Sequence, residues 1–414
     1  MLFIYRLAIN FIFLISPIII IYRIIKNKED PKRFLEKIGK FKKSSNNNLI
    51  WFHGSSVGEI LSVIPLIEKL EKRNNIKKIL ITSNTLSSAK IIKKLKLKKT
   101  FHQFLPLDTN FLVEKFLNHW KPKAAFFIDS EIWPNMVLKI KEKNISLILL
   151  NARITKKSFQ KWNSINNFSK KIFNKFDLCL SQNNISSNYL KILGAKNIKK
   201  IGNLKFSQST SELKDKSNLK IKKLFKKKKI VFTAISTHKG EELLCAKVHN
   251  NLKKKYKNIV SVIVPRHIHR ADEIKEELNL NGLKVHFHSS NNTIRNDTDI
   301  YLVDTFGETK SFLKLSKVAF MGKSIHGYGG QNPIEAARLG NRIIHGPNIE
   351  NFIEVYHFLK KHGISTKIKT YKDLEKLVVK FNRKKNYSNQ IIKKLAYTGK
   401  QILLNNEKEI NKYC

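Results

Sequence analysis

Apolar and polar residues alternate in blocks whose lengths fit buried strands and amphipathic helices. In the first half, an apolar run at 49–53 is followed by a Ser/Gly loop and then by apolar residues at helical spacing from Ile60 to Leu70. Helical patterns separate the further apolar runs, which lie at 78–82, 124–128, 146–150 and 178–180. Strand and helix patterns in this order predict an α/β domain with a parallel, doubly wound sheet.

The same order restarts near residue 229. A strand pattern is followed by a Ser/Thr-rich loop that ends in Gly-Glu, and then by a helical pattern from Leu243. Apolar runs recur at 259–264, 284–287, 300–303, 317–321 and 342–344. The stretch 207–228 is polar and rich in lysine, which is typical of a linker between domains. The chain is therefore predicted to contain two Rossmann-like domains, 49–206 and 229–414, that face a cleft.

Residues 1–25 predict a helix that anchors the protein in a membrane. The stretch from Leu7 to Ile25 is nearly all apolar and about twenty residues long, enough to span a bilayer. No small-residue cleavage site follows it, which favours a retained anchor over a signal peptide. A helix lying in the membrane interface is the alternative, because Pro17 can break the span. The run is followed by basic residues that favour a cytoplasmic location for the rest of the chain: Lys26, Lys28, Lys32 and Arg33.

Residues 26–48 are predicted to form a basic linker or amphipathic segment. The composition of the whole chain adds three further indications. With 42% apolar and 27% charged residues, the chain is too apolar to be disordered. The net charge of +49 indicates an anionic partner, although lysine enriched together with isoleucine and asparagine also fits a solvated surface. Cys179, Cys245 and Cys414 lie far apart, which argues against a disulfide framework or a zinc site and indicates a reducing compartment.

The loop from Gly54 to Glu59 is the first candidate site, since ligands of doubly wound sheets bind where strands end and helices begin. Ser56 followed by Glu59 is also the pattern of a helix capping box. Gly58 favours a function, because a glycine inside a helix start lets a substrate approach closely. A carboxylate at this place suits a general base.

The segment from Gly327 is the second candidate site. It reads Gly-Tyr-Gly-Gly-Gln-Asn-Pro-Ile-Glu-Ala-Ala, a glycine-rich loop that leads into a helix. Asn332 is expected at the N-cap, Pro333 at the first helical position and Glu335 at the third. Backbone amides and a helix N-terminus attract phosphate, so a nucleotide site is favoured over a plain turn.

One further polar cluster follows a predicted strand, and another precedes one. Pro265, Arg266 and His267, with His269 and Arg270 close behind, are predicted to contact a phosphate or carboxylate, because no third metal ligand accompanies the histidines. The sequence Asp297-Thr298-Asp299 resembles a D-x-D metal motif, but no other carboxylate cluster supports it. A solvated loop is therefore the preferred interpretation.

Together these residues resemble the 3-deoxy-D-manno-octulosonic acid (Kdo) transferases of lipid A assembly. The resemblance covers almost the whole chain, including the apolar N-terminus. It rests on ten ordered segments: 50–53 with 55–59, 130–135, 151–154, 202–206, 236–238, 264–267, 304–308, 329–335, 346–348, and Asn351 with Phe352. The departures are Thr309-Lys310-Ser311 where the family is apolar, Lys323 where it has glycine, and Gln331 where histidine is common.

The resemblance implies a GT-B fold, in which the first domain binds a lipid acceptor and the second a CMP-sugar. Glu59 would be the catalytic base, assisted at the transition state by Glu131 and Lys205. The implied CMP contacts are Pro265, Arg266, Phe306, Gly307, Glu308, Asn332, Pro333, Ile334 and Glu335. No metal or other cofactor is expected, because Arg266 and the glycine-rich loop can stabilise the departing phosphate.

The implied reaction is inverting transfer of Kdo from CMP-Kdo to a lipid A precursor (lipid IVA) at the cytoplasmic face of the bacterial inner membrane. The protein would contact the membrane through its N-terminal helix and basic surface, without a nucleic-acid partner. Two alternatives remain: a GT-B transferase that uses a UDP-sugar and a lipid acceptor, and a basic membrane-bound module that only holds anionic lipid or nucleic acid. The second needs neither Glu59 nor the glycine-rich loop.

Overall fold

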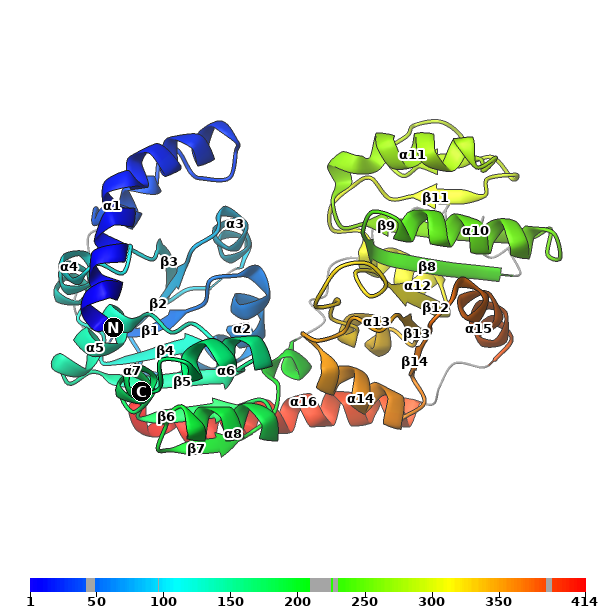
Figure 1. Ribbon diagram of the computed structural model, residues 1–414. Helices are drawn as coiled ribbons and strands as arrows, with labels where there is room; N and C mark the ends of the chain where they lie inside the picture. The colour runs from blue at the N-terminus through cyan, green and yellow to red at the C-terminus, as the bar shows by residue number, and fades with distance from the viewer. Residues whose placement is uncertain (42–48, 96, 209–224, 226–229, 385–388) are drawn as a thin grey trace. The chain divides into compact units, whose positions relative to one another are not determined.

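The computed structural model describes residues 1–41, 49–95, 97–208, 225, 230–384 and 389–414 (Figure 1). The chain forms two compact units. The first unit comprises Met1–Ser209 and Ala396–Cys414, and the second comprises Thr210–Leu395. Each contains a seven-stranded sheet in which all neighbouring strands are parallel. The predicted α/β class, with two doubly wound domains, is confirmed.

The sheet of the first unit has the order β3-β2-β1-β4-β5-β6-β7. Every residue of β1 and β4 is buried, because a parallel sheet is covered by helices on both faces. The order reverses between β1 and β4, and the crevice at the carboxyl ends of such strands is the usual ligand site of this fold. The strands are β1 (Leu49–His53), β2 (Lys78–Ser83), β3 (Thr100–Phe104), β4 (Ala124–Ile128), β5 (Ser146–Ala152), β6 (Leu178–Ser181) and β7 (Ile198–Lys200).

Helices α2, α3, α4, α6 and α8 of the first unit begin at side-chain caps. The side chains of Ser56, Thr85, Thr109, Thr155 and Asn183 each accept a hydrogen bond from the backbone amide three residues on. The elements are α1 (Leu2–Ile25), α2 (Val57–Glu71), α3 (Leu86–Lys94), α4 (Asn110–Trp120), α5 (Pro134–Glu142), α6 (Lys156–Asn163), α7 (Asn166–Phe173) and α8 (Asn184–Ile192), with 3₁₀ turns η1 (Phe34–Ile38) and η2 (Leu204–Ser207).

The sheet of the second unit has the order β10-β11-β9-β8-β12-β13-β14, which reverses between β8 and β12. Its strands are β8 (Ile230–Thr237), β9 (Ile259–Pro265), β10 (Val285–Phe287), β11 (Ile300–Leu302), β12 (Val318–Met321), β13 (Arg342–His345) and β14 (Ser365–Lys367). Its helices are α10 (Glu241–Lys253), α11 (Ala271–Leu280), α12 (Thr309–Leu315), α13 (Ile334–Arg338), α14 (Ile353–Lys361) and α15 (Tyr371–Arg383), with the 3₁₀ turn η3 (Ile268–Arg270).

All the apolar runs identified in the sequence form strands, but three strands lacked that signal. The strand β3 reads Thr-Phe-His-Gln-Phe, and β7 and β14 are three-residue strands at the sheet edges with few apolar residues. Edge strands bury less surface, so their sequences carry little periodicity. In addition, α10 begins at Glu241 rather than at Leu243.

The C-terminal end of the chain corrects the predicted domain 229–414. Helix α16 (Asn389–Ile410) and the turn η4 (Asn411–Tyr413) follow α15, yet Ala396–Cys414 belong to the first unit. The Glu407 carboxylate accepts hydrogen bonds from Lys69 Nζ at 2.7 Å and Arg73 at 2.8 Å, both on or next to α2. These ion pairs and the close packing of Gly399 hold the segment there.

The predicted linker 207–228 lies largely outside the described residues. Phe225 is described, and its buried ring packs against Tyr301 and Phe312 of the second unit at centroid distances of 5.9 and 6.3 Å. Ser207 ends η2 in the first unit. Both ends of the predicted linker therefore contain residues that take part in the folded units. The polar stretch 43–48 also lies outside the described residues.

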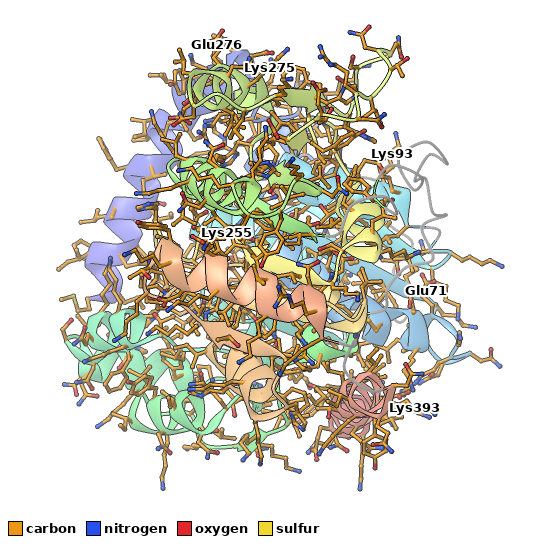
Figure 2. All side chains as sticks on the ribbon, turned by 90° about the vertical axis from the view of Figure 1, so that its right-hand side faces the viewer. Glu71, Lys93, Lys255, Lys275, Glu276 and Lys393 are labelled. Atoms are coloured by element: carbon orange, nitrogen blue, oxygen red, sulfur yellow. The ribbon has the colours of Figure 1, made fainter. Side chains whose placement is uncertain are left out.

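Much of the positive charge is on side chains that extend into solvent (Figure 2). Lys93 on α3, Lys255 after α10 and Lys393 on α16 are all exposed. These lysines support the solvated-surface interpretation of part of the net charge of +49.

Substitution of Gly399 tests the packing of α16. A Cβ at this position would lie 2.0 Å from the backbone carbonyl oxygen of Phe206. Gly399→Ala should therefore destabilise the protein by about 1–3 kcal/mol through overpacking, although alanine normally stabilises a helix by about 1 kcal/mol relative to glycine. Chemical denaturation measures the change. The exposed Asn405→Ala on the same helix is the control and should change stability by less than about 0.5 kcal/mol. A more stable Gly399→Ala variant would contradict this packing.

Candidate active site

Polar residues lie at or just after the carboxyl ends of five strands in the sheet of the first unit. Because β1, β4, β5, β6 and β7 are neighbours, their carboxyl ends form one continuous edge. These residues are Glu59 after β1, Asp129 and Glu131 after β4, Asn151 in β5, Gln182 after β6, and Asn203 with Lys205 after β7. The edge thus brings together the three predicted catalytic residues Glu59, Glu131 and Lys205.

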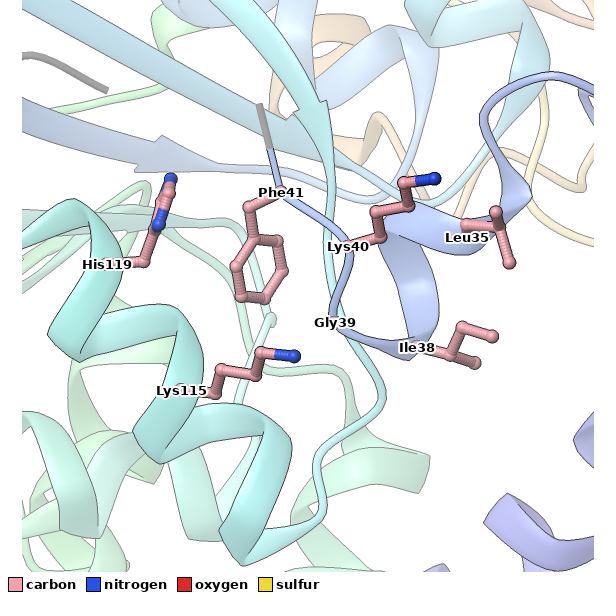
Figure 3. Close-up of a pocket in the computed structure, with 7 residues that line it drawn as sticks. All are labelled: Leu35, Ile38, Gly39, Lys40, Phe41, Lys115 and His119. Carbon is pink, nitrogen blue, oxygen red and sulfur yellow. The ribbon is translucent and has the colours of Figure 1, made fainter. Parts of the chain in front are cut away.

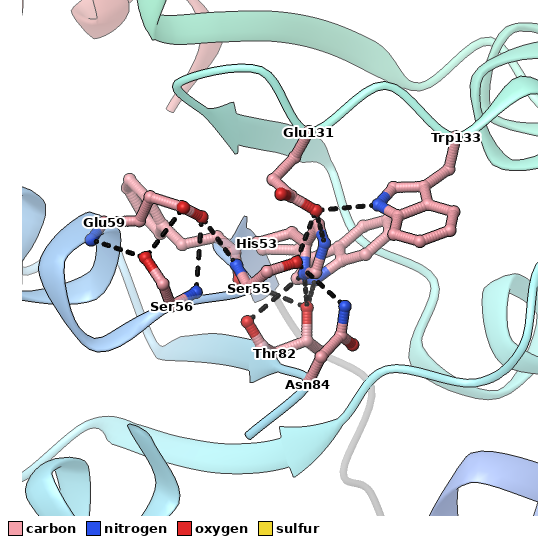
Figure 4. A network of polar contacts seen from close by, with 10 residues as sticks. His53, Ser55, Ser56, Glu59, Thr82, Asn84, Glu131 and Trp133 are labelled. Carbon is pink, nitrogen blue, oxygen red and sulfur yellow. Dashed lines mark hydrogen bonds and ion pairs between the residues drawn. The ribbon is translucent and has the colours of Figure 1, made fainter. Parts of the chain in front are cut away.

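Glu59 forms the capping box that its spacing from Ser56 predicts (Figure 4). Glu59 Oε2 accepts hydrogen bonds from the amides of Ser55 at 2.7 Å and Ser56 at 3.4 Å, and Glu59 Oε1 accepts one from Ser56 Oγ at 2.7 Å. Gly58 is exposed, and a Cβ there would meet no atom within 4 Å. Since packing does not require a glycine at this position, the open space above it is available to a ligand.

Glu131 is held by a convergent set of donors (Figure 4). Its Oε2 atom accepts hydrogen bonds from Ser55 Oγ at 2.6 Å and Trp133 Nε1 at 2.9 Å, and His53 Nε2 lies 3.1 Å away. Thr82 Oγ1 accepts a hydrogen bond from Trp51 Nε1 at 2.8 Å and lies 2.9 Å from His53 Nδ1. The Thr82 hydroxyl can then donate to Nδ1, which leaves Nε2–H to donate to Glu131.

Glu59 and Glu131 differ in their ionisation. Burial raises the pKa of Glu59 and the negative charges of Asp129 and Glu131 raise it further, against the lowering effect of the hydrogen bonds from Ser56 and Ser55. Burial also acts to raise the pKa of Glu131, but the interactions with His53, Ser55 and Trp133 together lower it below its usual value. Glu131 is therefore a fixed negative charge, whereas Glu59 is the stronger base of the two.

Lys205 is buried beside Asp129, with Lys205 Nζ 3.5 Å from Asp129 Oδ2. Asp129 Oδ1 accepts hydrogen bonds from Asn151 Nδ2 at 2.6 Å and Gln182 Nε2 at 3.0 Å. Asn203 donates to Gln182 Oε1 at 3.0 Å and accepts from the Lys205 amide at 2.9 Å. Asp129 and Asn151 have φ of 57° and 52°, a left-handed conformation that is unusual for non-glycine residues. This buried network orients Lys205 through Asp129.

In the second unit, the carboxyl end of β9 carries a cationic cluster. Pro265 ends the strand, and the exposed Arg266 guanidinium follows without an ion pair to any residue in the described part of the chain. The ring of His267 lies 5.7 Å from His238 and 5.6 Å from His269. Burial lowers the pKa of His267, and the neighbouring charges of His238, Arg266, His269 and Arg270 lower it further. Such a cluster is suited to bind an anion.

Two other predicted contact segments lie close together in this unit. Phe306, Gly307 and Glu308 follow β11, whose neighbour in the sheet is β9. Phe306 is 75% exposed, so its ring is available for stacking. Lys310, two residues after Glu308, forms an ion pair with Glu335 at 3.3 Å. One of the departures from the family pattern, Lys310, thus joins the segment 306–308 to Asn332, Pro333, Ile334 and Glu335.

The glycine-rich loop differs from its prediction in two respects. Helix α13 begins at Ile334 with Pro333 as its N-cap, one residue later than expected, and the Asn332 side chain accepts a hydrogen bond from the Ile334 amide at 3.1 Å. The helix has only five residues, so its dipole contributes little to anion binding. The Gly329 amide already donates to Glu350 at 2.8 Å. Side chains rather than the helix terminus must therefore supply most of the positive charge for a phosphate.

Glu241 holds the start of the same loop. Its buried carboxylate accepts hydrogen bonds from the amides of Lys323 at 2.7 Å, Ser324 at 3.0 Å and Ile325 at 3.0 Å, and from that of His238 at 2.9 Å. Lys323 has φ of 56°, a left-handed conformation that glycine, the residue expected here from the family resemblance, adopts without strain. Glu241 therefore links the loops after β8 and β12, which flank the point where the strand order reverses.

Asp297 and Asp299 have different environments. Asp297 is an exposed residue paired with Lys284 and Arg295, as the solvated-loop prediction requires. Asp299 is instead buried, where it interacts with His249 at 3.3 Å and Lys253 at 2.7 Å, so the prediction was wrong for this residue. Among the residues that the structure describes, no three His, Cys, Asp or Glu side chains are grouped to hold a metal ion.

A cavity of about 440 Å³ lies elsewhere in the first unit (Figure 3). Its lining residues are Leu35, Ile38, Gly39, Lys40, Phe41, Lys115 and His119. His119 is near the end of α4, which leads into the amino end of β4. The cavity is therefore at the opposite edge of the sheet from Glu59 and does not belong to the site.

Comparison with known proteins identifies the family. Residues 32–208 match the profile of the family described as 3-Deoxy-D-manno-octulosonic-acid transferase (kdotransferase). The 3-deoxy-D-manno-octulosonic acid transferase of Rickettsia bellii is 32% identical over 367 residues, which cover 87% of this chain and 87% of the relative. The chain belongs to the Kdo transferase family.

Similarity to solved structures agrees with the two-unit fold. A UDP-N-acetylglucosamine 2-epimerase has a TM-score of 0.58 at 12% identity and covers 89% of this chain and 97% of its own. The glycotransferase of kitacinnamycin has a TM-score of 0.55 at 10% identity and covers 89% of this chain and 100% of its own. Membership of the Kdo transferase family makes the chain a glycosyltransferase, and the structural similarity shows that its fold is of the GT-B type.

The site also contains residues that the sequence analysis did not assign. Asp129, Asn151, Gln182 and Asn203 form the network around Lys205, His53 supports Glu131, and Glu241 orders the second unit's loop. Asp129, Gln182 and Asn151 are polar residues at the carboxyl ends of apolar strands, and this position in the sequence could have identified them. The roles of Glu241 and His53 depend on contacts with distant segments, which periodicity does not reveal.

Glu241→Gln should destabilise the second unit by about 1–3 kcal/mol, because the amide NH₂ would face backbone donors that need an acceptor. Chemical denaturation gives the free energy of unfolding, and hydrogen exchange should become faster at the amides of Lys323, Ser324 and Ile325. The control is Glu273→Gln on α11, whose carboxylate is exposed. Equal effects of the two substitutions would show that Glu241 does not order this loop.

Proposed function

We propose that this Kdo transferase moves Kdo from CMP-Kdo onto a hydroxyl of a lipid A precursor, with inversion at the anomeric carbon. The observation that carries the proposal is the pair of carboxylates Glu59 and Glu131. Their pKa values are shifted in opposite directions, and the more basic member lies beside the open space at Gly58. A division of this kind is common where one carboxylate takes a proton and another stays charged.

In this mechanism Glu59 is the general base. The oxygen of the acceptor hydroxyl attacks the anomeric carbon of Kdo while its proton passes to the Glu59 carboxylate. The bond between that carbon and the phosphate oxygen breaks, and CMP leaves with the electron pair. Glu131, held by His53, Ser55 and Trp133, contributes negative charge that favours an oxocarbenium-like transition state.

The second unit would bind the CMP donor. Arg266, with His267 and Arg270 nearby, would stabilise the negative charge that develops on the departing phosphate. Exposed Phe306 offers a surface for the cytosine ring, and Glu335 offers a carboxylate to the ribose hydroxyls. Lys205 would pair with the carboxylate of Kdo or the CMP phosphate. These side chains supply the charge that the reaction needs without an added metal or cofactor.

The proposed location is the cytoplasmic face of the bacterial inner membrane. Among the described residues, α1 is a helix long and apolar enough to cross a membrane by length and composition. Lys26, Lys28 and Lys32 follow it and are exposed, as expected beside anionic phospholipids. An acceptor that carries acyl chains would be reached at this surface.

Transfer assays on purified protein with CMP-Kdo and a tetraacylated lipid A precursor test the reaction. Glu59→Gln should lower kcat by about 10²- to 10⁴-fold, the usual contribution of a general base, while CMP still binds. Ser56→Ala is the matched control, because it removes the helix cap at a cost of about 1 kcal/mol but keeps the carboxylate. A similar decrease in kcat for both variants would show that Glu59 acts only as a helix-capping residue and not as the base. Binding of UDP as strong as that of CMP would contradict the proposed donor.

The pH dependence of transfer tests the raised pKa of Glu59. A base acts only when ionised, so kcat/KM should fall as the pH is lowered through a pKa above the ordinary value for glutamate. Asp129→Asn removes a negative neighbour and should move this acidic limb to lower pH. The exposed Glu142→Gln on α5 should leave the limb in place. An acidic limb at the same pH in Asp129→Asn as in the unsubstituted protein would show that Asp129 does not raise the pKa of Glu59.

A further inference from the structure

Helix α1 is continuous from Leu2 to Ile25, although Pro17 lies inside it. Proline has no amide hydrogen, so the carbonyl oxygen of Phe13 lacks its usual helical donor. The Ser16 hydroxyl donates to that oxygen at 2.7 Å and replaces the missing bond. The helix is about 36 Å long at 1.5 Å per residue, which is sufficient to cross a hydrocarbon core of about 30 Å. Length alone therefore does not distinguish a spanning helix from one that lies in the membrane interface.

Both ends of α1 are attached to the same folded unit. Near the first turn, the Tyr5 hydroxyl donates to Asp108 Oδ2 at 2.7 Å and Arg6 Nε donates to Asn135 Oδ1 at 3.0 Å. In the last turn, Arg23 Nε donates to the buried carboxylate of Glu29 at 3.2 Å. The two attachment points, residues 5 and 23, are about 27 Å apart along the helix.

The attachment at the second end continues into the sheet. Lys37 Nζ donates to Glu29 Oε2 at 2.6 Å and to the carbonyl oxygen of Asn84 at 3.2 Å, next to β2. The Glu36 carboxylate on η1 accepts a hydrogen bond from the Phe104 amide at 2.8 Å, on β3. A helix that spans a bilayer has its ends on opposite sides of the hydrocarbon. Here the polar contacts at both ends hold α1 along one folded unit.

The two faces of α1 differ in solvent exposure along the whole helix. The less exposed positions recur at helical spacing and include Leu2, Tyr5, Ile9, Ser16, Ile20 and Arg23. On the opposite side, an apolar stripe is more than half exposed at every position and consists of Phe3, Leu7, Phe11, Leu14, Ile18 and Ile25. Figure 1 shows α1 running along the side of the first unit. The apolar stripe therefore faces outward over the full helix.

We infer that α1 does not cross the bilayer but lies in its interface, with the apolar stripe among the acyl chains near the headgroups. The occupant of this face is an anionic phospholipid surface, because the exposed residues Lys26, Lys28 and Lys32 follow the helix directly and their positive charge complements that of the lipid headgroups. The inference rests on the proposed membrane location and specifies its topology. The first unit, which carries Glu59, is then held against the membrane along one side.

Depth measurements on vesicles test this topology. Single cysteines are introduced at Phe3, Phe11, Ile18 and Ile25 in a Cys414→Ser background, where the remaining Cys179 and Cys245 are buried. Each is labelled with a fluorophore that nitroxide lipids quench according to depth, in full-length protein on phosphatidylcholine and phosphatidylglycerol vesicles. An interfacial helix gives four similar depths, about 5–10 Å below the phosphates. Labels at Phe11 and Ile18 near the bilayer centre, with those at Phe3 and Ile25 near opposite surfaces, would overturn the inference.

Sidedness provides a second measurement. Dithionite added outside the vesicles should reduce all four labels, and also a label at Lys255→Cys, an exposed position in the second unit that should not be quenched by lipid. Protection of the Phe3 label, together with those at Phe11 and Ile18, while the Ile25 label is reduced, would indicate a spanning helix. Protein that does not float with vesicles would overturn both the topology and the membrane location, and lipid-free dimers that protect the four labels would assign the apolar stripe to a second copy. Retained Kdo transfer shows that each labelled variant is folded.

Discussion

Both sheets are parallel and covered on both faces, and the rest of the molecule is organised around this burial. An unpaired polar group in a strand that is buried along its whole length costs up to several kcal/mol of desolvation free energy. Polar side chains are therefore concentrated where the chain leaves the sheet, as at Asp129 after β4 and Gln182 after β6. Since all strands in a sheet run in the same direction, these exits share one edge. The proposed chemistry of each unit depends on that geometry.

The two halves use the same dipeptide at this edge for different purposes. In the first unit, Gly58 and Glu59 lie inside the first turn of α2, and the carboxylate remains beside open space. In the second unit, Gly240 is the N-cap of α10 and Glu241 is fully buried under four backbone amides. A shift of two helical positions separates a carboxylate available for proton transfer from one that holds a loop in place.

The sequence predicted the central strands well, because continuous apolar runs are required where both faces are covered. Glu59, Glu131 and Lys205 were identified by resemblance to the Kdo transferases, and the folded first unit brings them to one edge. Long-range partners were not predictable. Asp299 has the appearance of a solvated loop residue until His249, 50 positions away, is placed beside it. Likewise, no periodic pattern indicates that Lys69 pairs with Glu407, 338 positions away.

The path of α16 determines how the protein can be divided. The helix begins in the second unit at Asn389, and its residues from Ala396 onward belong to the first, so the main chain passes between the units twice. A fragment that stops near residue 208, where the family match ends, would omit the segment that neutralises Lys69 and Arg73. Recombinant expression of the first unit alone therefore calls for a fusion of 396–414 to the shortened chain, or for a circular permutation in which 396–414 precede residue 1.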